Sequence, residues 1–436
     1  MKRLYFLLLT LLTTVLLTAQ TKEENKSGWN LGVLPSVMFD SDVGFQYGAI
    51  LNLFNYGDGS YYPQYRYMVY AEWSRQTRGG AINQLLFDAP HLLPHNLRLT
   101  ADLSYLTEKA LDFYGFNGRE AVYQPELEDP DHPYYISRMY YRHQRRMTRL
   151  QADLQGKLQE HWRWIGGVGW FDTRLGTVDI SRLNKGKDAD DLLPDTALLY
   201  DQYVQWGVLP ADQAEGGSHL MFKAGLIYDT RDNEPNPMRG VWTEAVLLAS
   251  PALGNSHNLS FVRYTLIHRQ YVTLKKEVLS LACRLGVQGT LAGEYPFYLF
   301  SYMQSSFDKA TNRDGLGGAR TLRGVLRNRV VGDGMAYGNA ELRWKFLRTT
   351  VWKQNIYLAL NLFTDAGMVV DPLDVSMSAM PAALKWEQQT DRPHLSSGMG
   401  LRIAMNQNFI VAVDYGRAWS KRDGESGLYI NLGYLF

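Results

Sequence analysis

Four arginines stand close together in one glycine-rich stretch, GGARTLRGVLRNRVVGDG, at residues 317–334. They are Arg320, Arg323, Arg327 and Arg329, and no acidic residue follows them before Asp333. A guanidinium group stays charged and presents a fork of donors that fits a carboxylate. The stretch turns tightly and can approach a wall closely at Gly317, Gly318 and Gly324. Its chemistry therefore depends on which acidic side chains the rest of the fold brings to it.

Other reactive residues form no defensible site. The chain has nine histidines, of which His143 and His268 are the best placed, but none has a nucleophile–histidine–acid spacing. An acidic run at 126–132 matches no calcium loop, so we predict no metal site. No glycine-rich loop follows a strand and opens a helix, so we predict no nucleotide and no other cofactor. The formal net charge of +1 gives no reason to expect nucleic acid as a partner. We predict that the chain is not an enzyme.

The elements that must position these residues have a period of two. In YGNAELRWKF, from Tyr337, apolar residues alternate with Asn339, Glu341, Arg343 and Lys345. The segment IYLALNLFTDAG at 356–367 repeats the pattern, and aromatic residues make up 13% of the chain. One apolar face and one polar face, edged with Tyr and Trp, are typical of strands between lipid and a wet lumen. The pattern predicts an all-β fold, a transmembrane antiparallel β-barrel.

About sixteen strands are predicted, the even number that single-chain barrels require. Their expected ranges are 28–36, 43–54, 64–75, 79–88, 96–107, 137–156, 160–178, 217–229, 240–248, 258–272, 278–290, 336–348, 355–368, 395–404, 408–418 and 427–436. From the third hairpin onward, long and short connections alternate, as in outer-membrane barrels with long outer loops and short periplasmic turns. The arginines fall in the longest connection, between the strands at 278–290 and 336–348.

Two fates are open to this connection. It can lie in solvent, with its arginines hydrated or touching lipopolysaccharide, or it can fold back into the barrel. For the second fate, Glu341 and Asp365 lie on the inner faces of their strands, and Phe363 and Gly367 share the face of Asp365. Glu341 and Asp365 are the predicted wall partners of the arginines.

Both ends of the chain carry patterns typical of protein-targeting signals. Lys2 and Arg3 precede an apolar run that ends in small residues, so residues 1–20 are predicted to be a signal peptide, 21–27 a short periplasmic tail and 28–436 the barrel. The last predicted strand alternates apolar residues through Tyr434 to Phe436, the usual sorting signal of such barrels. The predicted location is the outer membrane of a Gram-negative cell.

Several motifs resemble one family. GGARTLRGV, GNAELR, FTDAG, GMGLR and VDYG, all within 217–436, are similar to the barrel of the BamA/TamA-type superfamily, also called bacterial surface antigen barrels. The resemblance implies a sixteen-stranded barrel whose loop between strands eleven and twelve folds inward. It also implies that the loop-tip pair Arg323–Gly324 meets Asp365. Val325 replaces the usual aromatic residue after this pair. YDTRDNEPNPMRGVW resembles the family's turn between strands eight and nine, where Asp229, Arg231 and Asp232 are expected to make turn contacts.

The resemblance implies a function in assembly, insertion or translocation of protein or lipid at the outer membrane. Periplasmic polypeptide-transport-associated domains, which most members carry, are not expected between the signal peptide and the first strand. The expected partners are therefore membrane lipids and lipopolysaccharide, a client polypeptide or lipid, and a periplasmic or lipoprotein accessory subunit. In the family the first and last strands close weakly. Here Pro35 removes a ladder donor, and Gly433 loosens the last strand.

Two other functions remain open at this stage. A passive solute channel would need a lumen that the 317–334 stretch leaves free. A surface-exposed structural barrel would present the connections at 108–136 and 179–216.

Overall fold

The computed structural model describes residues 27–60, 65–90, 97–234, 236–306, 313–351, 354–373, 390–405 and 409–436. The predicted signal peptide and all but the last residue of the predicted tail lie outside these ranges. In the described part of the chain, no helix is long and apolar enough to cross a membrane.

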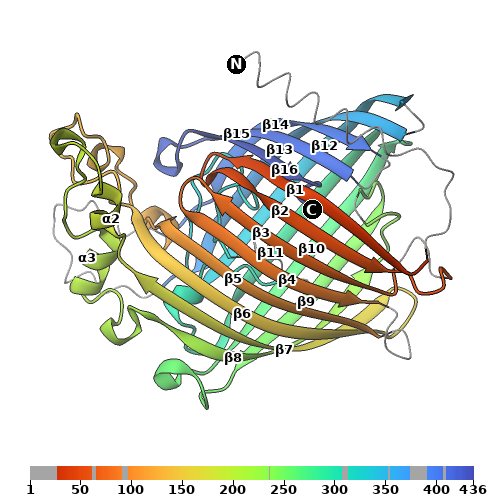
Figure 1. Cartoon of the computed structure of the whole chain (residues 1–436), viewed down its shortest axis with the longest axis horizontal. Coiled ribbons are helices and arrows are strands. Elements are labelled where there is room, and N and C mark those ends of the chain that lie inside the picture. Colours follow the sequence, from red (N-terminus) through yellow and green to blue (C-terminus); the bar gives the residue numbers. More distant parts are fainter. Residues whose placement is uncertain are drawn as a thin grey trace.

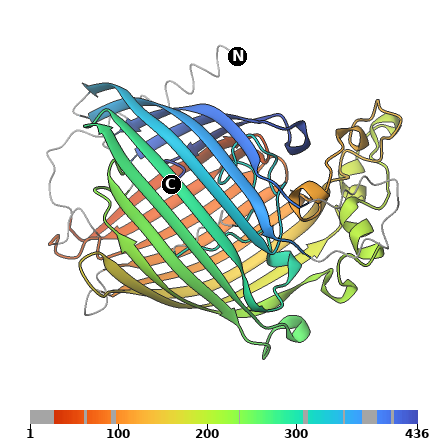
Figure 2. The same cartoon turned by 180° about the vertical axis from the view of Figure 1, so that it is seen from behind.

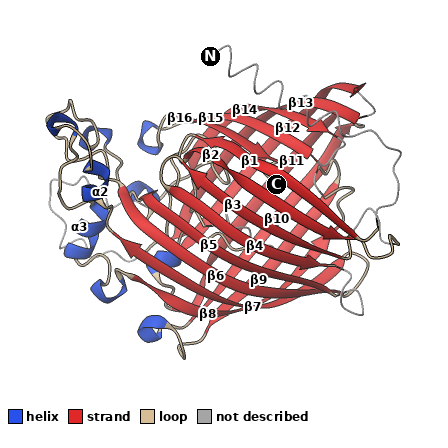
Figure 3. Ribbon diagram, viewed as in Figure 1, coloured by secondary structure: helices blue, strands red, loops and turns tan. Residues whose placement is uncertain are grey.

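Sixteen antiparallel strands form one closed barrel in which each strand pairs with its neighbours in the chain and β1 meets β16 (Figures 1 and 3). Their bounds are β1 Trp29–Asp40, β2 Gly44–Asn55, β3 Tyr67–Gln76, β4 Gly80–Ala89, β5 Arg98–Asp112, β6 Arg142–Lys157, β7 Trp162–Gly176, β8 Gly216–Asp229, β9 Gly240–Ser250, β10 Phe261–Lys275, β11 Leu279–Gly293, β12 Gly334–Val351, β13 Gln354–Asp371, β14 His394–Met405, β15 Phe409–Ala418 and β16 Ser426–Leu432. The predicted fold class, a barrel of about sixteen strands, is confirmed.

Short helices gather at one end of the barrel (Figure 3). They are α2 Ile180–Asn184, α3 Leu199–Gln205 and the 3-10 turns η2 Gly118–Glu120, η3 Pro125–Leu127, η4 Ala189–Asp191, η5 Ala211–Gln213, η6 Ser256–Asn258, η7 Phe297–Leu299 and η9 Lys421–Asp423. The long connections after β5, β7 and β11 end here, and we call it the long-connection end. Short turns such as 158–161 and 276–278 join strands at the opposite end.

The predicted alternation places the side chains as expected. On β12, Trp344 is 48% exposed on the outer face, whereas Glu341 and Arg343 are almost fully buried on the inner face. On β13, Leu362 faces outward, and Asp365 is buried. Apolar side chains therefore cover the outside, and charged side chains line the lumen.

The apolar core of the molecule lies among the long connections rather than between layers of strands. Aromatic residues from 113–141, 200–203 and 295–302 pack together with Phe171, Phe261 and Val331. This packing corrects the predicted strand at 137–156. Tyr140 and Tyr141 belong to the aromatic cluster, and the amide of Tyr140 closes a turn onto Ser137, so β6 begins at Arg142.

The last strand is also shorter than predicted. The period-two pattern extended it to Phe436, but β16 ends at Leu432. Gly433 adopts φ +83°, a left-handed conformation that glycine permits, and breaks the alternation. As a result Tyr434 is buried beside Tyr357 of β13 instead of continuing the outward face of Leu432.

Candidate functional site

Residues 313–333, which we call the arginine segment, fold back on themselves between β11 and β12. The backbone groups of Leu316 and Val330 bond to each other in both directions, and the amide of Gly318 donates to the carbonyl of Val325. Gly317, Gly318 and Gly324 all have positive φ values, of 122°, 73° and 96°. The segment is therefore a tight loop with residues 319–324 near its tip.

Arg323, at the loop tip, binds two wall carboxylates. Its Nε and Nη2 donate to Oδ2 and Oδ1 of Asp365 over 2.9 and 3.0 Å, and its backbone amide also reaches Oδ2, over 3.0 Å. Its Nη1 donates to Oε1 of Glu341 over 2.7 Å. All three side chains are fully shielded from solvent. The arrangement satisfies the fork of a buried cation, the geometry in which an arginine–carboxylate pair is strongest.

The aromatic ring predicted on the same face completes this contact. The guanidinium carbon of Arg323 lies 3.5 Å from the centre of the Phe363 ring, a cation–π contact. Gly367 leaves room for the segment, because a Cβ there would lie 2.9 Å from Cδ1 of Leu316. Asp365, Phe363 and Gly367 thus contact the segment from successive inner positions of β13.

Further charged residues extend the cluster along the lumen wall. Arg343 donates to Glu341, and Arg402 forms two bonds with Asp414, which itself lies 3.6 Å from Arg323. Three arginines therefore meet three carboxylates: Arg323, Arg343 and Arg402 with Glu341, Asp365 and Asp414. The charges of this group balance, which lowers the cost of burying them.

Gly324 brings the segment against strands on the other side of β13. Its amide donates to the hydroxyl of Tyr429 on β16 over 3.0 Å. A Cβ at Gly324 would lie 2.4 Å from the carbonyl carbon of Gly416 on β15. The segment can approach β15 this closely because both positions are glycine.

A second charged group ties the segment to a different wall. Glu108 of β5 accepts hydrogen bonds from Arg145 of β6 and from Arg313 and Arg327 of the segment. Asp314 bonds to the same Arg145 and Arg327. In the closed order of strands, β5 and β13 lie half a circuit apart, and Figures 1 and 2 show these two walls from opposite sides. The arginine segment thus contacts opposite walls.

The other residues selected from the sequence lie apart from this cluster. In the turn after β8, Asp229 accepts from the amide and guanidinium of Arg231, and Asp232 accepts from the amides of Met238 and Arg239. These are local turn bonds. Pro35 faces Ala49 of β2 in the ladder and has no partner on β16 among the described residues.

The end of the chain turns toward the charged residues of the lumen. The ring of Tyr434 lies 4.3 Å from the guanidinium of Arg343, and the Phe436 ring lies 5.1 Å from those of Arg284 and Arg343. Among the described residues, no three His, Cys, Asp or Glu side chains gather where they could hold a metal ion.

Sequence reasoning missed several members of the cluster. They are Asn339, Arg402, Asp414, Gly416 and Tyr429. A signal was present for four of them, since they fall within the motifs GNAELR, GMGLR and VDYG. Tyr429 had no signal except its inward position on the last strand.

Together, the closed sheet, the apolar outer face and the charged lumen define a transmembrane β-barrel. A family model for the Omp85 superfamily domain matches residues 75–436, and the chain belongs to this superfamily. The BamA/TamA-type resemblance is thereby confirmed. A search of curated proteins found no match.

Two solved structures have a similar fold. One is BamA from Haemophilus ducreyi lacking POTRA domains 1–3, with a TM-score of 0.56 and 14% identity, covering 94% of this chain and 71% of that one. The other is CdiB from Escherichia coli, with a TM-score of 0.53 and 8% identity, covering 95% of this chain and 64% of that one. At these identities the likeness concerns the barrel fold.

Proposed function

We propose that this chain is an outer-membrane barrel that assists the insertion or translocation of a polypeptide or lipid, and that it works at the seam between β1 and β16. In this proposal the arginine segment holds the lumen closed while the client uses the seam. Membership of the Omp85 superfamily and the fold shared with BamA and CdiB support this class of function.

The observation that carries the proposal is the short pairing of the seam. In the described part of the chain, β1 pairs with β2 along its whole length, from Trp29 to Asp40, but with β16 only at Phe39 and Asp40. The rest of the β1 edge, residues 29–38, has no ladder partner on β16 among the described residues. Unpaired backbone groups at an edge attract another strand, and in a bilayer they are costly to leave unsatisfied. A client strand that pairs with β1 would satisfy them.

Bonds at the long-connection end hold the seam together. The amide and hydroxyl of Ser41 both donate to the carbonyl of Leu428, and the amide of Leu428 donates to the hydroxyl of Ser41. A seam that is fixed at one end and unpaired at the other supports opening from the unpaired end.

The proposal includes partners. A periplasmic or lipoprotein accessory subunit would deliver the client, and lipid and lipopolysaccharide would surround the barrel. The predicted signal peptide at 1–20 fits this location. Affinity purification from native outer membranes tests this part, and we expect a stoichiometric periplasmic or lipoprotein subunit. Recovery of the barrel alone would contradict it.

A disulfide across the seam tests the mechanism. Phe39 and Ile430 are ladder partners, so Phe39→Cys with Ile430→Cys, in a Cys283→Ser background, can lock the seam. The matched control joins Phe39→Cys to its β2 partner, Phe45→Cys, and leaves the seam free. In cells that depend on this chain, we expect the seam lock to reduce outer-membrane protein content and a reductant to restore it. Full function of the locked protein would refute the proposal.

Conductance tests the passive-channel alternative. Because the arginine segment contacts opposite walls, we expect little steady current through the intact chain in planar bilayers. Removal of residues 313–333 should then raise the current. A large, steady conductance of the intact chain would favour the channel.

A further inference from the structure

A transverse row of inward side chains crosses five strands near the arginine segment. In register from β9 to β13 the row contains Trp242, Arg269, Arg284, Asn339 and Asp365. Arg269 and Arg284 therefore stand directly opposite each other on neighbouring strands. Two like charges in this position repel each other unless a counter-charge lies nearby.

Arg284 is buried and has no carboxylate partner among the residues that the structure describes. Only 8% of it is exposed. Its Nε donates to Oδ1 of Asn339 over 2.8 Å, and its Nη2 donates to the carbonyl of Arg320 over 3.0 Å. Both acceptors are neutral. The carboxylate next along the row is Asp365, which Arg323 already binds through both oxygens.

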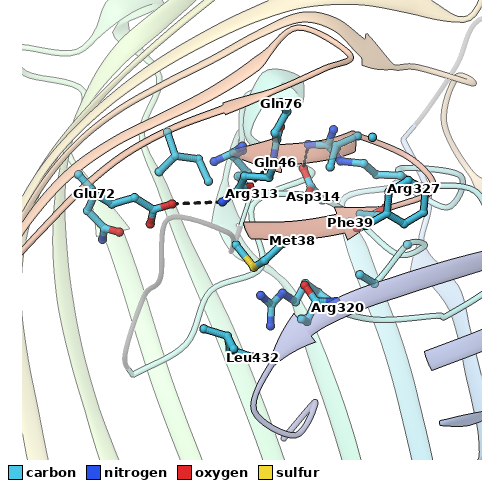
Figure 4. A pocket seen from close by; sticks show the side chains of 18 of the residues that line it. Met38, Phe39, Gln46, Glu72, Gln76, Arg313, Asp314, Arg320, Arg327 and Leu432 are labelled. Atoms are coloured by element: carbon cyan, nitrogen blue, oxygen red, sulfur yellow. Dashed lines mark hydrogen bonds and ion pairs between the residues drawn. The ribbon is translucent and has the colours of Figure 1, made fainter. Parts of the chain in front are cut away.

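Two more cations share this situation. Within the described ranges, Arg269 keeps a buried Nε without a hydrogen-bond partner, and its guanidinium lies 5.8 Å from the Trp242 ring. The side chain of Arg320 makes no hydrogen bond or ion pair within the described residues, and Figure 4 shows it apart from the group of Arg313, Asp314 and Arg327. None of the three guanidinium groups has a described carboxylate within 4.0 Å.

The three arginines line one cavity. Its volume is about 510 Å³, and Trp242, Tyr337 and Phe436 contribute aromatic walls. Arg231, Glu234, Glu244 and Asp314 also line the cavity. Arg231 binds Asp229, and Asp314 binds Arg145 and Arg327. None of the three lining carboxylates forms an ion pair with Arg269, Arg284 or Arg320 among the described residues. Glu244 instead accepts bonds from the amide and hydroxyl of Ser306. The cavity thus holds three arginines that no carboxylate contacts directly among the described residues.

We propose that this cavity is a binding site for a phosphate-bearing anion, with Arg284 and Arg320 as its principal ligands and Arg269 as the third. Planar guanidinium forks match the oxygens of a phosphate group, and a doubly charged phosphate balances more of this charge than one carboxylate. Such a ligand supplies a counter-charge to Arg284. Asp365 does not provide it, because both of its carboxylate oxygens already bind Arg323. The proposal goes beyond the function proposed above, because it holds whether or not the seam opens.

Binding of inorganic phosphate to the purified full chain in detergent tests the site. The thermal unfolding midpoint is measured against phosphate concentration, with chloride at equal ionic strength as the reference. We expect saturable stabilisation by phosphate. Arg284→Gln should weaken the affinity roughly tenfold or more, since a charge-assisted hydrogen bond is lost. Arg320→Gln should act in the same direction.

A matched variant and a second measurement keep the test decisive. Arg348, 43% exposed and paired with Glu277, is an arginine outside the cavity, so Arg348→Gln should bind phosphate as the wild type does. Without phosphate, Arg284→Gln should unfold at a temperature equal to or higher than the wild type, because an uncompensated buried charge is gone.

A second experiment, with lipids, distinguishes the two sources of the phosphate group, a free anion and a lipid headgroup. The chain is reconstituted in nanodiscs of phosphatidylglycerol or of phosphatidylcholine. Saturable binding of inorganic phosphate identifies a free anion. Stabilisation confined to phosphatidylglycerol, and lost in Arg284→Gln, identifies a lipid headgroup. Equal phosphate affinity in the wild type and Arg284→Gln, or no effect of either probe on the wild type, overturns the proposal.

Discussion

Two regions of the closed sheet differ in how far their strands pair: the wall formed by β12 and β13, and the seam between β1 and β16. The wall is paired over a much greater length than the seam. β12 and β13 pair from Gly334 to Val351, and their inner face carries the carboxylates that bind Arg323. Among the residues that the structure describes, the seam pairs only at Phe39 and Asp40. The difference teaches that one barrel can concentrate its polar interactions on one wall and leave the closure a few strands away weak, as the proposed lateral gate would require.

The largest effect is expected from removing the cation at the strong wall. Arg323→Ala leaves Glu341 and Asp365 buried without their common partner, which should cost about 3–5 kcal/mol of unfolding free energy. Asp365→Ala should also lower the stability, because it removes a carboxylate that binds the buried Arg323 guanidinium. The measurement is the urea or heat unfolding midpoint in detergent.

An exposed pair gives the matched comparison for Arg323. Arg348→Ala breaks an ion pair with Glu277 whose side chains are 43% and 64% exposed. Exposed pairs contribute roughly 0–1 kcal/mol. If Arg323→Ala shifts the midpoint no more than Arg348→Ala, the wall cluster does not hold the segment.

A smaller effect is expected from the glycine that lets the segment approach β15. Gly324→Ala adds a Cβ 2.4 Å from the backbone of Gly416 and also strains a φ of +96°. Gly254→Ala is the control, since its φ is +80° and its Cβ would meet nothing within 4 Å. Gly324→Ala should destabilise the barrel by roughly 1–3 kcal/mol more than the control, the cost of overpacking. Equal unfolding midpoints for the two variants would mean that the loop tip shifts to accommodate the added Cβ at no cost in stability.

The strong wall was more accessible to sequence reasoning than the seam. The alternation in β12 and β13 identified which side chains face inward, because a strand with one apolar face has only one orientation that places this face toward the lipid. Glu341 and Asp365 were candidates on that ground, and the family resemblance implied that Arg323 meets Asp365. The structure brings these three residues together. The partner of Arg327 could not be found in the same way. Glu108 is distant in the chain and becomes a neighbour only when the barrel closes.

The seam was harder to predict because its extent depends on pairing rather than on residue type. The alternating residues after Gly433 read as strand, and only the left-handed conformation of that glycine ends β16. Likewise, the alternation in residues 29–38 does not distinguish an unpaired edge from a paired one, because edge and interior strands share the same period of two, and only Pro35, which lacks a ladder donor, pointed to an edge.

A still smaller change tests how the seam is held. Ser41→Ala removes the hydroxyl that accepts from the amide of Leu428, and the loss of one hydrogen bond should cost about 0.5–1.5 kcal/mol. Amide exchange should become faster for Leu428 and for its neighbours across the seam. Thr77→Val removes a comparable bond, to the amide of Phe45, away from the seam. Faster exchange of β16 in both variants would indicate general loosening instead of a local effect.

The smallest effect concerns the connections above the strong wall. Asp391 accepts bonds from the amides of Arg119 and Val369 and lies 3.0 Å from a ring nitrogen of His394. Burial alone would raise its pKa, but the hydrogen bond and charge of His394, with these amides, hold the pKa of Asp391 below its ordinary value of 3.8. A carboxylate with a lowered folded pKa stabilises the protein above its unfolded pKa, and this contribution declines as the pH falls through the folded pKa.

The pH test compares three proteins. The unfolding midpoint of the wild type should decline as the pH falls from about 5 to 2, a range in which carboxylates take up protons. Asp391→Asn should start lower and decline less steeply, because its amide does not titrate. Asp131→Asn, at an exposed residue of the 113–141 connection, should follow the wild type. If Asp391→Asn declines as steeply as the wild type, the bonds of Asp391 contribute no acid-sensitive stability. The contacts that stabilise the β12–β13 wall would then be confined to its strands.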